Sequence, residues 1–150
     1  MSATLETPVM LGPKEVSERL GCSSRGACYV IRLLGRQDVG CDSVALRVTE
    51  HALNGWLGMV SLMQPRPGLI RGVYFIADGR AVKIGVSDCV SARLSTLQKC
   101  NPRTLDLLAT FPGTAAAEAY FHGRFRELRI HGEWYRRAGA LDAFLEGHGL

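Results

Sequence analysis

A carboxylate and an imidazole stand four residues apart in the second half of this 150-residue chain, as Glu118 and His122. Both fall within residues 115–128, where helical spacing puts them on one face with Phe121 and Phe125. A half-buried carboxylate is costly unless a cation or hydrogen-bond donors surround it. Ligation of a metal ion would meet that requirement, so this face is a candidate metal site.

The residues before this helix predict strands. Short apolar runs at 73–77 and 81–85 flank Asp78-Gly79, a pair that supplies the positive φ angles of tight hairpin turns. Residues 105–111 have the composition of a third strand. We therefore expect a small antiparallel sheet beside the candidate site.

Helices are expected to flank this sheet. Val90, Leu94 and Leu97 recur at helical spacing and predict a helix that packs on the hairpin, with Arg93 beside its apolar stripe. Thr114 is a candidate cap for the helix that carries the carboxylate and the imidazole. The predicted fold class is α+β.

Several short motifs follow one another in a fixed order through this half. They are Val73-Tyr74-Phe75, Lys83-Ile84-Gly85, Arg93, Glu118 and Gly132-Glu133-Trp134-Tyr135. Over roughly residues 71 to 137 their order and spacing resemble the GIY-YIG nucleases, in which a hairpin carries two tripeptides and an arginine follows the second glycine by about eight residues. The chain is most similar to the compact phage-type branch of these nucleases. That branch shares the Lys-Ile-Gly tripeptide, a glutamate followed four residues later by histidine, and the Gly-Glu-Trp-aromatic ending.

The resemblance implies hydrolysis of phosphodiester bonds, with Glu118 as the ligand of a single Mg²⁺ or Mn²⁺ ion. Arg93 would pair with the scissile phosphate, and Tyr74 would orient or deprotonate the attacking water. His122 matches the histidine of the compact branch and is counted with the catalytic residues. Lys83 stands where better-known members have a second tyrosine, and its ammonium could contact phosphate or lower the pKa of the Tyr74 phenol.

The end of this motif set has a mainly structural interpretation. Trp134 and Tyr135 are expected in the core, and Glu133 either caps a helix or supports the site.

The first 62 residues predict helices of a different kind. Pro13 suits the first position of a helix that Gly21 ends, and Ser23 or Ser24 can cap a second helix extending to about Leu34. The outer face of the second helix carries Arg25, Cys28, Tyr29, Arg32 and Arg36. Two short helices joined by a tight turn favour a helix-turn-helix whose second helix enters the major groove.

Further elements would complete a winged module. Residues 39–48 contain a candidate hairpin, and Thr49 can cap a third helix. Over roughly residues 11–60 the pattern resembles the small winged-helix domains of the excisionase and mercury-resistance regulator type. The residues expected to touch DNA are Arg25, Tyr29, Arg32 and Arg36. The alternative is a helical packing or partner-binding domain.

The chain is therefore divided into four segments by prediction. These are a flexible tail at 1–10, a winged helix-turn-helix domain at 11–62, a linker at 63–70 and a GIY-YIG nuclease-like domain at 71–150. The linker assignment rests on Pro65 and Pro67, because neither proline suits a helix interior.

Composition agrees with a nucleic-acid partner. The formal charge is +4, a moderate bias towards polyanions. The five cysteines form no Cys-x-x-Cys pair, so they indicate neither a zinc site nor a disulfide framework. No apolar stretch has the length of a membrane span. We expect a protein of the cytoplasm of a bacterial or phage-infected cell. Its expected partner is double-stranded DNA, and the sequence leaves open whether the protein forms a homodimer.

Two functions follow from these observations. The leading one is a DNA-binding, metal-dependent endonuclease of phage, prophage or mobile-element origin, delivered to DNA by its helix-turn-helix. The alternative is a catalytically inactive transcription regulator or DNA-organising protein that uses the nuclease fold for binding or dimerisation.

Overall fold

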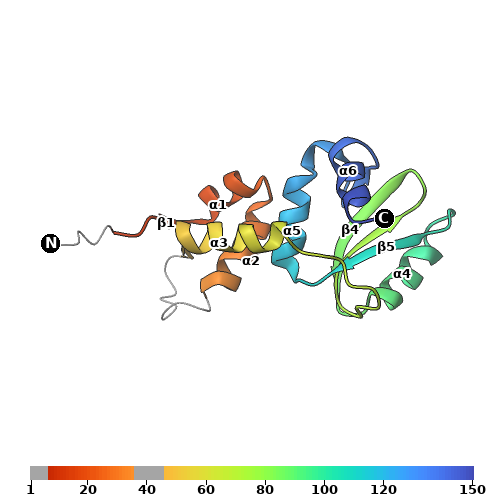
Figure 1. Ribbon diagram of the computed structural model, residues 1–150, viewed down its shortest axis with the longest axis horizontal. Coiled ribbons are helices and arrows are strands. Elements are labelled where there is room, and N and C mark those ends of the chain that lie inside the picture. The colour runs from red at the N-terminus through yellow and green to blue at the C-terminus, as the bar shows by residue number, and fades with distance from the viewer. Residues whose placement is uncertain (1–6, 36–45) are drawn as a thin grey trace.

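The computed structural model describes residues 7–35 and 46–150 and has a mixed α+β architecture (Figure 1). Its helices are Pro13–Leu20 (α1), Ser24–Gly35 (α2), Glu50–Ser61 (α3), Val90–Lys99 (α4), Ala115–Arg124 (α5) and Gly139–Gly147 (α6). A short 3-10 helix, Arg126–Leu128 (η1), follows α5. The strands are Met10–Leu11 (β1), Val48–Thr49 (β2), Gly72–Ala77 (β3), Ala81–Ser87 (β4), Asp106–Phe111 (β5), Arg129–His131 (β6) and Trp134–Arg136 (β7).

The main sheet is antiparallel, with strand order β5-β3-β4-β7-β6. The predicted hairpin and the predicted third strand are confirmed as β3, β4 and β5. At the hairpin turn, Gly79 has a φ of +87°, and the Asp78 carboxylate accepts hydrogen bonds from the backbone N–H groups of Arg80 and Ala81 at 2.9 and 2.8 Å. Asp78 thus satisfies the turn backbone, and Gly79 supplies the left-handed conformation.

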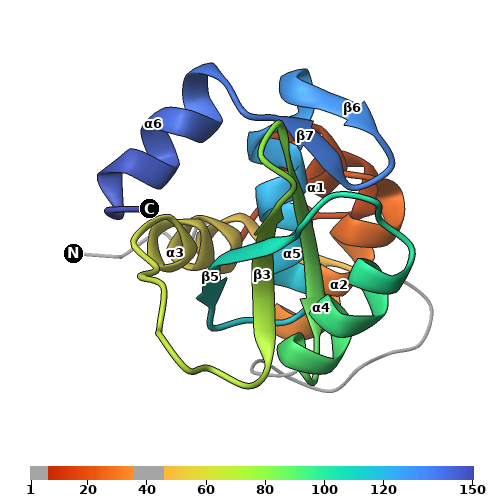
Figure 2. The ribbon, with the colours of Figure 1, turned by 90° about the vertical axis from the view of Figure 1, so that its right-hand side faces the viewer.

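The two faces of this sheet are covered by different helices (Figure 2). Because side chains alternate along a strand, Val73 and Phe75 of β3 point into the larger core with α5. Tyr74 and Ile76 point to the other face, where they pack with Val90 of α4. Neighbouring residues of β3 therefore serve two separate environments.

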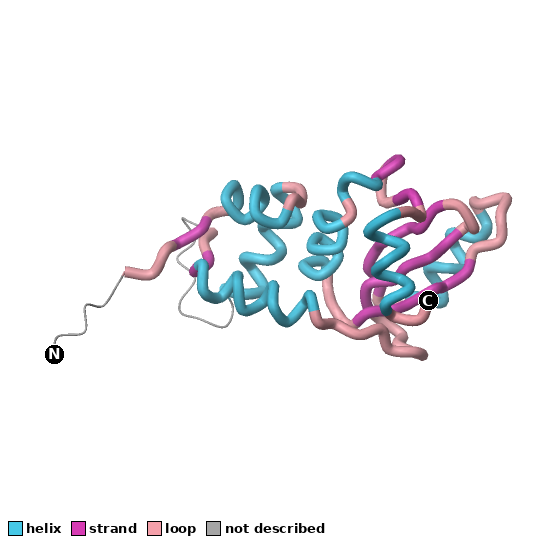
Figure 3. Tube along the Cα trace, turned by 45° about the horizontal axis from the view of Figure 1, so that its top comes forward, coloured by secondary structure: helices cyan, strands magenta, loops and turns pink. Residues whose placement is uncertain are grey.

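Over the described residues 7–35 and 46–62, the regular elements of the N-terminal part are helices and the short β1–β2 pair (Figure 3). The predicted bounds of α1 and α2 are confirmed, and Gly21 ends α1 in the left-handed conformation with a φ of 63°. The predicted Thr49 cap of α3 is also confirmed, since its hydroxyl accepts the Ala52 N–H at 3.2 Å. Met10, which the sequence assigned to the tail, lies in β1. The candidate hairpin at 39–48 lies largely outside the described residues.

Helix α5 joins the N-terminal helices to the sheet, and one continuous core includes residues from both. Helix α2 crosses α5 so closely that a Cβ at Gly26 would lie 2.8 Å from Cβ of Ala119. A Cβ at Gly123 of α5 would meet the backbone carbonyl of Leu20. The two glycines therefore allow a helix contact that a larger side chain would block.

Two parts of the structure were not anticipated from the sequence. The β6–β7 pair extends the sheet beyond β4, and α6 packs its buried residues Leu141, Phe144 and Leu145 on the core. The predicted linker at 63–70 contains no helix or strand, but Arg66 N–H donates to the Thr110 carbonyl at 2.8 Å. Within the described ranges, no helix is both long enough and apolar enough to cross a bilayer.

The close helix contact predicts a large effect of one methyl group. Gly123→Ala should destabilise the protein by about 1–3 kcal/mol, because the new Cβ is overpacked against backbone that cannot rotate away. Gly55→Ala is the matched control, since Gly55 is exposed within α3 with open space around its Cβ position and alanine should add about 0.5–1 kcal/mol there. Chemical denaturation measures both. Equal stabilities of the two variants would contradict the contact.

Candidate active site

The tripeptide Lys83-Ile84-Gly85 of β4 lies where its strand partner ends. β7 pairs with β4 only from Ala81 to Lys83. Lys83 is buried, with 7% of its surface exposed, and its Nζ lies 2.6 Å from a carboxylate oxygen of Glu133. Ile84 then donates its backbone N–H to the Glu133 carbonyl at 3.0 Å. Glu133 is thereby fixed to β4 by both its side chain and its backbone.

Tyr74 of β3 lies opposite Gly85, the last residue of this tripeptide. Tyr74 and Gly85 are register partners, and a Cβ on Gly85 would lie 2.6 Å from Cζ of the tyrosine ring. Only glycine leaves room for the ring there. The Tyr74 hydroxyl accepts a hydrogen bond from Nε of Arg93 on α4 at 3.3 Å, which raises the pKa of Arg93, with a smaller contribution from the charge of Glu133. The guanidinium is therefore a permanent positive charge beside the phenol.

Glu118 reaches the same edge of β4 from α5. Its Oε1 accepts the backbone N–H of Val86 at 3.0 Å and lies 3.7 Å from Nε2 of His122, one helical turn further on. The predicted cap of α5 is confirmed, since the Thr114 hydroxyl accepts the Ala116 N–H at 3.4 Å. The cap and the helix fix the starting point and direction of the carboxylate.

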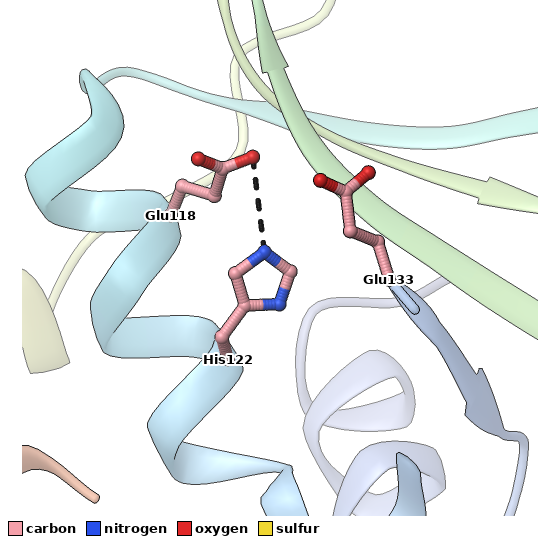
Figure 4. A group of neighbouring side chains, drawn as sticks. All are labelled: Glu118, His122 and Glu133. Carbon is pink, nitrogen blue, oxygen red and sulfur yellow. Dashed lines mark ion pairs between the residues drawn. The ribbon is translucent and has the colours of Figure 1, made fainter. Parts of the chain in front are cut away.

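Glu118, His122 and Glu133 converge (Figure 4). One ligand-type atom from each lies within 4.8 Å of the others. Two carboxylates and an imidazole form a donor set that suits a divalent first-row ion such as Mn²⁺, and the carboxylates alone suit Mg²⁺. The residues present therefore fit a divalent cation.

Tyr135 and Arg129 support His122 from the other side of its ring. His122 Nδ1 is hydrogen-bonded to the Tyr135 hydroxyl, which also accepts a bond from the Arg129 guanidinium at 2.9 Å. Burial raises the pKa of Tyr135, so its phenol is neutral at physiological pH. In the tautomer that carries its proton on Nδ1, His122 donates a hydrogen bond to the Tyr135 hydroxyl. Nε2 then presents a lone pair on the Glu118 side.

A cavity of about 630 Å³ opens over these side chains. Glu118, His122 and Glu133 line it together with Arg25 and Tyr29 of α2. The N-terminal helices therefore form part of the wall around the candidate site.

The predicted catalytic residues form two neighbouring groups, and of the five only Glu118 and His122 line the cavity. Tyr74 and Arg93 form one pair, Glu118 and His122 another, and Lys83 is connected to the second pair through Glu133.

The predicted DNA-binding residues are placed less uniformly. Arg25 and Tyr29 face the cavity, whereas Arg32 is exposed on α2 and does not line it. Arg36 lies outside the described residues.

Three residues of the site were not predicted in these positions. Glu133 was expected to cap a helix or support the site, Tyr135 was expected only in the core, and the sequence predicted no role for Arg129. Their positions follow from the pairing of β7 with β4 and from a bulged register between β6 and β7. The sequence signal was the Gly132-Glu133-Trp134-Tyr135 motif, in which a charged residue precedes two aromatic ones.

Comparison with known proteins gives one match. The chain matches no curated protein and no solved structure. A family profile, that of the T5orf172 domain, matches residues 71–146, which is just over half of the chain and covers β3 to α6. This phage-associated domain is related to nucleases of the GIY-YIG and HNH types. Because this profile matches more than half of the chain, the chain belongs to the T5orf172 domain family.

Proposed function

We propose that the protein is a metal-dependent endonuclease that hydrolyses phosphodiester bonds in DNA. The observation that carries the proposal is the convergence of Glu118, His122 and Glu133 within 4.8 Å. Membership of a nuclease-related family adds independent support. Two features of hydrolytic sites, a ligand set for a cation and a fixed cationic side chain, thus occur in the same region.

Each residue has a role that follows from its contacts. Glu118 and His122 would hold a Mg²⁺ or Mn²⁺ ion, with Glu133 as a third ligand. A bound ion of this kind neutralises charge that develops on a phosphate and lowers the pKa of a coordinated water. Arg93, which remains cationic, binds the scissile phosphate through its planar fork.

The Tyr74 phenol orients the attacking water. Its hydroxyl accepts a hydrogen bond from Arg93 at 3.3 Å, and its ring packs directly over Gly85. The group is therefore fixed before substrate binds. Lys83 holds Glu133 at 2.6 Å and limits repulsion between the two carboxylates. The lysine thus has a positioning role at the place where better-known GIY-YIG nucleases have a second tyrosine.

Delivery to DNA is assigned to the N-terminal helices. α1 and α2 are joined at Gly21 by a tight turn, and this turn supports the proposed helix-turn-helix. Arg32 on the exposed face of α2 suits contact with a double-stranded DNA backbone. A winged module and a homodimer remain predictions, and light scattering on the purified protein tests the second.

One observation favours a different function. The Lys83 ammonium already neutralises Glu133 from within the protein, as a metal ion would from outside. A site balanced in this way suits a DNA-binding regulator or DNA-organising protein without cleavage. Absence of cleavage of all DNA substrates with Mg²⁺ and with Mn²⁺, together with intact DNA binding, would support this alternative.

Cleavage provides the first test. Glu118→Gln should lower cleavage of plasmid and oligonucleotide DNA by about 100-fold or more, since charge neutralisation by a metal ion is worth several kcal/mol. The amide oxygen still accepts the Val86 N–H, so the fold should be unchanged in circular dichroism. Glu146→Gln is the control, because Glu146 is exposed on α6 away from the cavity. Equal cleavage by both variants would exclude the assigned role.

Metal affinity provides the second test and does not depend on cleavage. His122→Ala should weaken Mn²⁺ binding by at least about tenfold, a loss typical even of an outer-shell partner. Mg²⁺ binding should change less, because Mg²⁺ prefers oxygen ligands. Isothermal titration calorimetry measures both ions. An unchanged Mn²⁺ affinity would remove His122 from the ligand set.

Arg93 provides the third test. Arg93→Lys keeps the positive charge but loses the planar fork and the Nε donor to Tyr74, so turnover should fall about 100-fold with a smaller change in KM. Arg71→Lys is the matched control, since Arg71 is exposed and pairs with Asp88. A variant in which only KM rises would show that Arg93 contributes uniform binding instead.

A further inference from the structure

The cavity over the candidate site has two walls that come from distant parts of the sequence. One wall is the α1–α2 turn and the first part of α2, from Gly21 to Tyr29. The other wall continues from Glu118 and His122 on α5 through Arg126 and Arg129 to Gly132 and Glu133. A ligand of this cavity would therefore touch the N-terminal helices and the convergent residues Glu118, His122 and Glu133 at once, whereas Tyr74 and Arg93 do not line it.

The charges on these walls have a clear distribution. Three arginines line the cavity, namely Arg25, Arg126 and Arg129. Its acidic residues, Glu118 and Glu133, belong to the convergent ligand set. Arg126 pairs with Glu127 at 3.0 Å and Arg129 donates to the Tyr135 hydroxyl, whereas Arg25 is exposed. The arginine side of the cavity suits the phosphates of a nucleic-acid strand.

An aromatic side chain lies among these arginines. Tyr29 is 41% exposed and lines the cavity from α2. A tyrosine of a buried helix face would pack on the core, but this one is exposed and lines the cavity. Cationic groups with an interspersed aromatic ring are the arrangement with which proteins hold unpaired nucleic acid, because an exposed base stacks on the ring.

The α2 wall is fixed relative to the ligand set. A Cβ on Gly26, one residue after Arg25, would lie 2.8 Å from Cβ of Ala119, one residue after Glu118. A Cβ on Gly21 would lie 2.6 Å from the guanidinium of Arg126, so the turn also touches the opposite wall. These contacts hold Arg25 and Tyr29 at a set position beside the site.

We propose that α2 is a wall of the substrate channel and that Arg25 and Tyr29 position the strand to be cut. The strand is unpaired where it crosses the site, with one base stacked on Tyr29 and its phosphates on Arg25, Arg126 and Arg129. The proposal rests on the proposed function for the identity of the site, and adds a substrate class: DNA that is single-stranded or locally unpaired at the cleavage position.

This role differs from the major-groove role expected from the sequence. A helix reading duplex DNA would use Arg25, Tyr29 and Arg32 together, since all three lie on its outer face. The cavity includes the first two and leaves out Arg32. Arg25 and Arg32 are therefore a matched pair on one helix that separates the two roles.

Binding of a fluorescent 12-nucleotide single strand, measured by anisotropy in the Glu118→Gln background with EDTA at fixed salt, tests the proposal without cleavage. Tyr29→Ala should weaken binding about tenfold, whereas Tyr29→Phe keeps the ring and should restore it. Arg25→Ala should weaken binding for every sequence and reduce the salt dependence, more than Arg32→Ala does. Lys14→Ala, on exposed α1, is the charge control, and circular dichroism checks each fold.

The outcomes are distinct. Tighter binding of the single strand than of the same sequence as a duplex, lost with Tyr29→Ala and kept with Tyr29→Phe, supports the proposal. Equal loss with Arg25→Ala and Arg32→Ala, confined to one duplex sequence, overturns it in favour of groove reading. Absence of cleavage by the wild-type protein with these binding effects intact would refute only the nuclease function, because the channel would then hold a strand without cutting it.

Discussion

The free edge of β4 is the constraint on which the candidate site depends. Within the described part of the chain, β4 has no strand partner on its β7 side after Lys83, and backbone N–H groups at such an edge need acceptors. Ile84 finds the Glu133 carbonyl and Val86 finds the Glu118 carboxylate, both at 3.0 Å. The hydrogen bonds that complete the sheet are thus the ones that bring the two glutamates together, so the fold and the chemistry use the same donors.

The electrostatic balance of the site follows from this arrangement. Carboxylate oxygens of Glu118 and Glu133 within 4.8 Å of each other would repel without nearby positive charge. The buried Lys83 ammonium provides that charge at 2.6 Å, and its own burial is offset by the ion pair and by the Trp134 ring, whose centroid lies 5.8 Å from Nζ. Arg93 adds a second cation on the α4 side. The charge of the two glutamates is therefore offset by lysine and arginine side chains of the protein itself.

The local part of this structure could be predicted from the sequence, and the long-range part could not. The β3–β4 hairpin follows from Asp78-Gly79, and the shared face of Glu118 and His122 follows from their spacing. Glu133 joins them only because β7, a strand of three residues, pairs with β4. Such short pairings are set by tertiary packing and leave little periodicity to detect. Likewise, a glycine within α2 has low helix propensity, and its presence at position 26 is explained only by the contact with Ala119, 93 residues later in the sequence (119 − 26).

The role of α5 has a consequence for how this chain can change by recombination. One side of the helix carries Glu118 and His122 together with Phe121, which packs into the core, and another side receives α1 and α2 at Ala119 and Gly123. A T5orf172 domain transplanted onto another N-terminal module would keep its ligand set but lose the cavity wall that α2 provides. Chimeras would inherit that wall only from donors whose helices also meet through small residues. Exchange of N-terminal modules is therefore restricted by steric fit at α5, and the two halves are expected to evolve as a single unit.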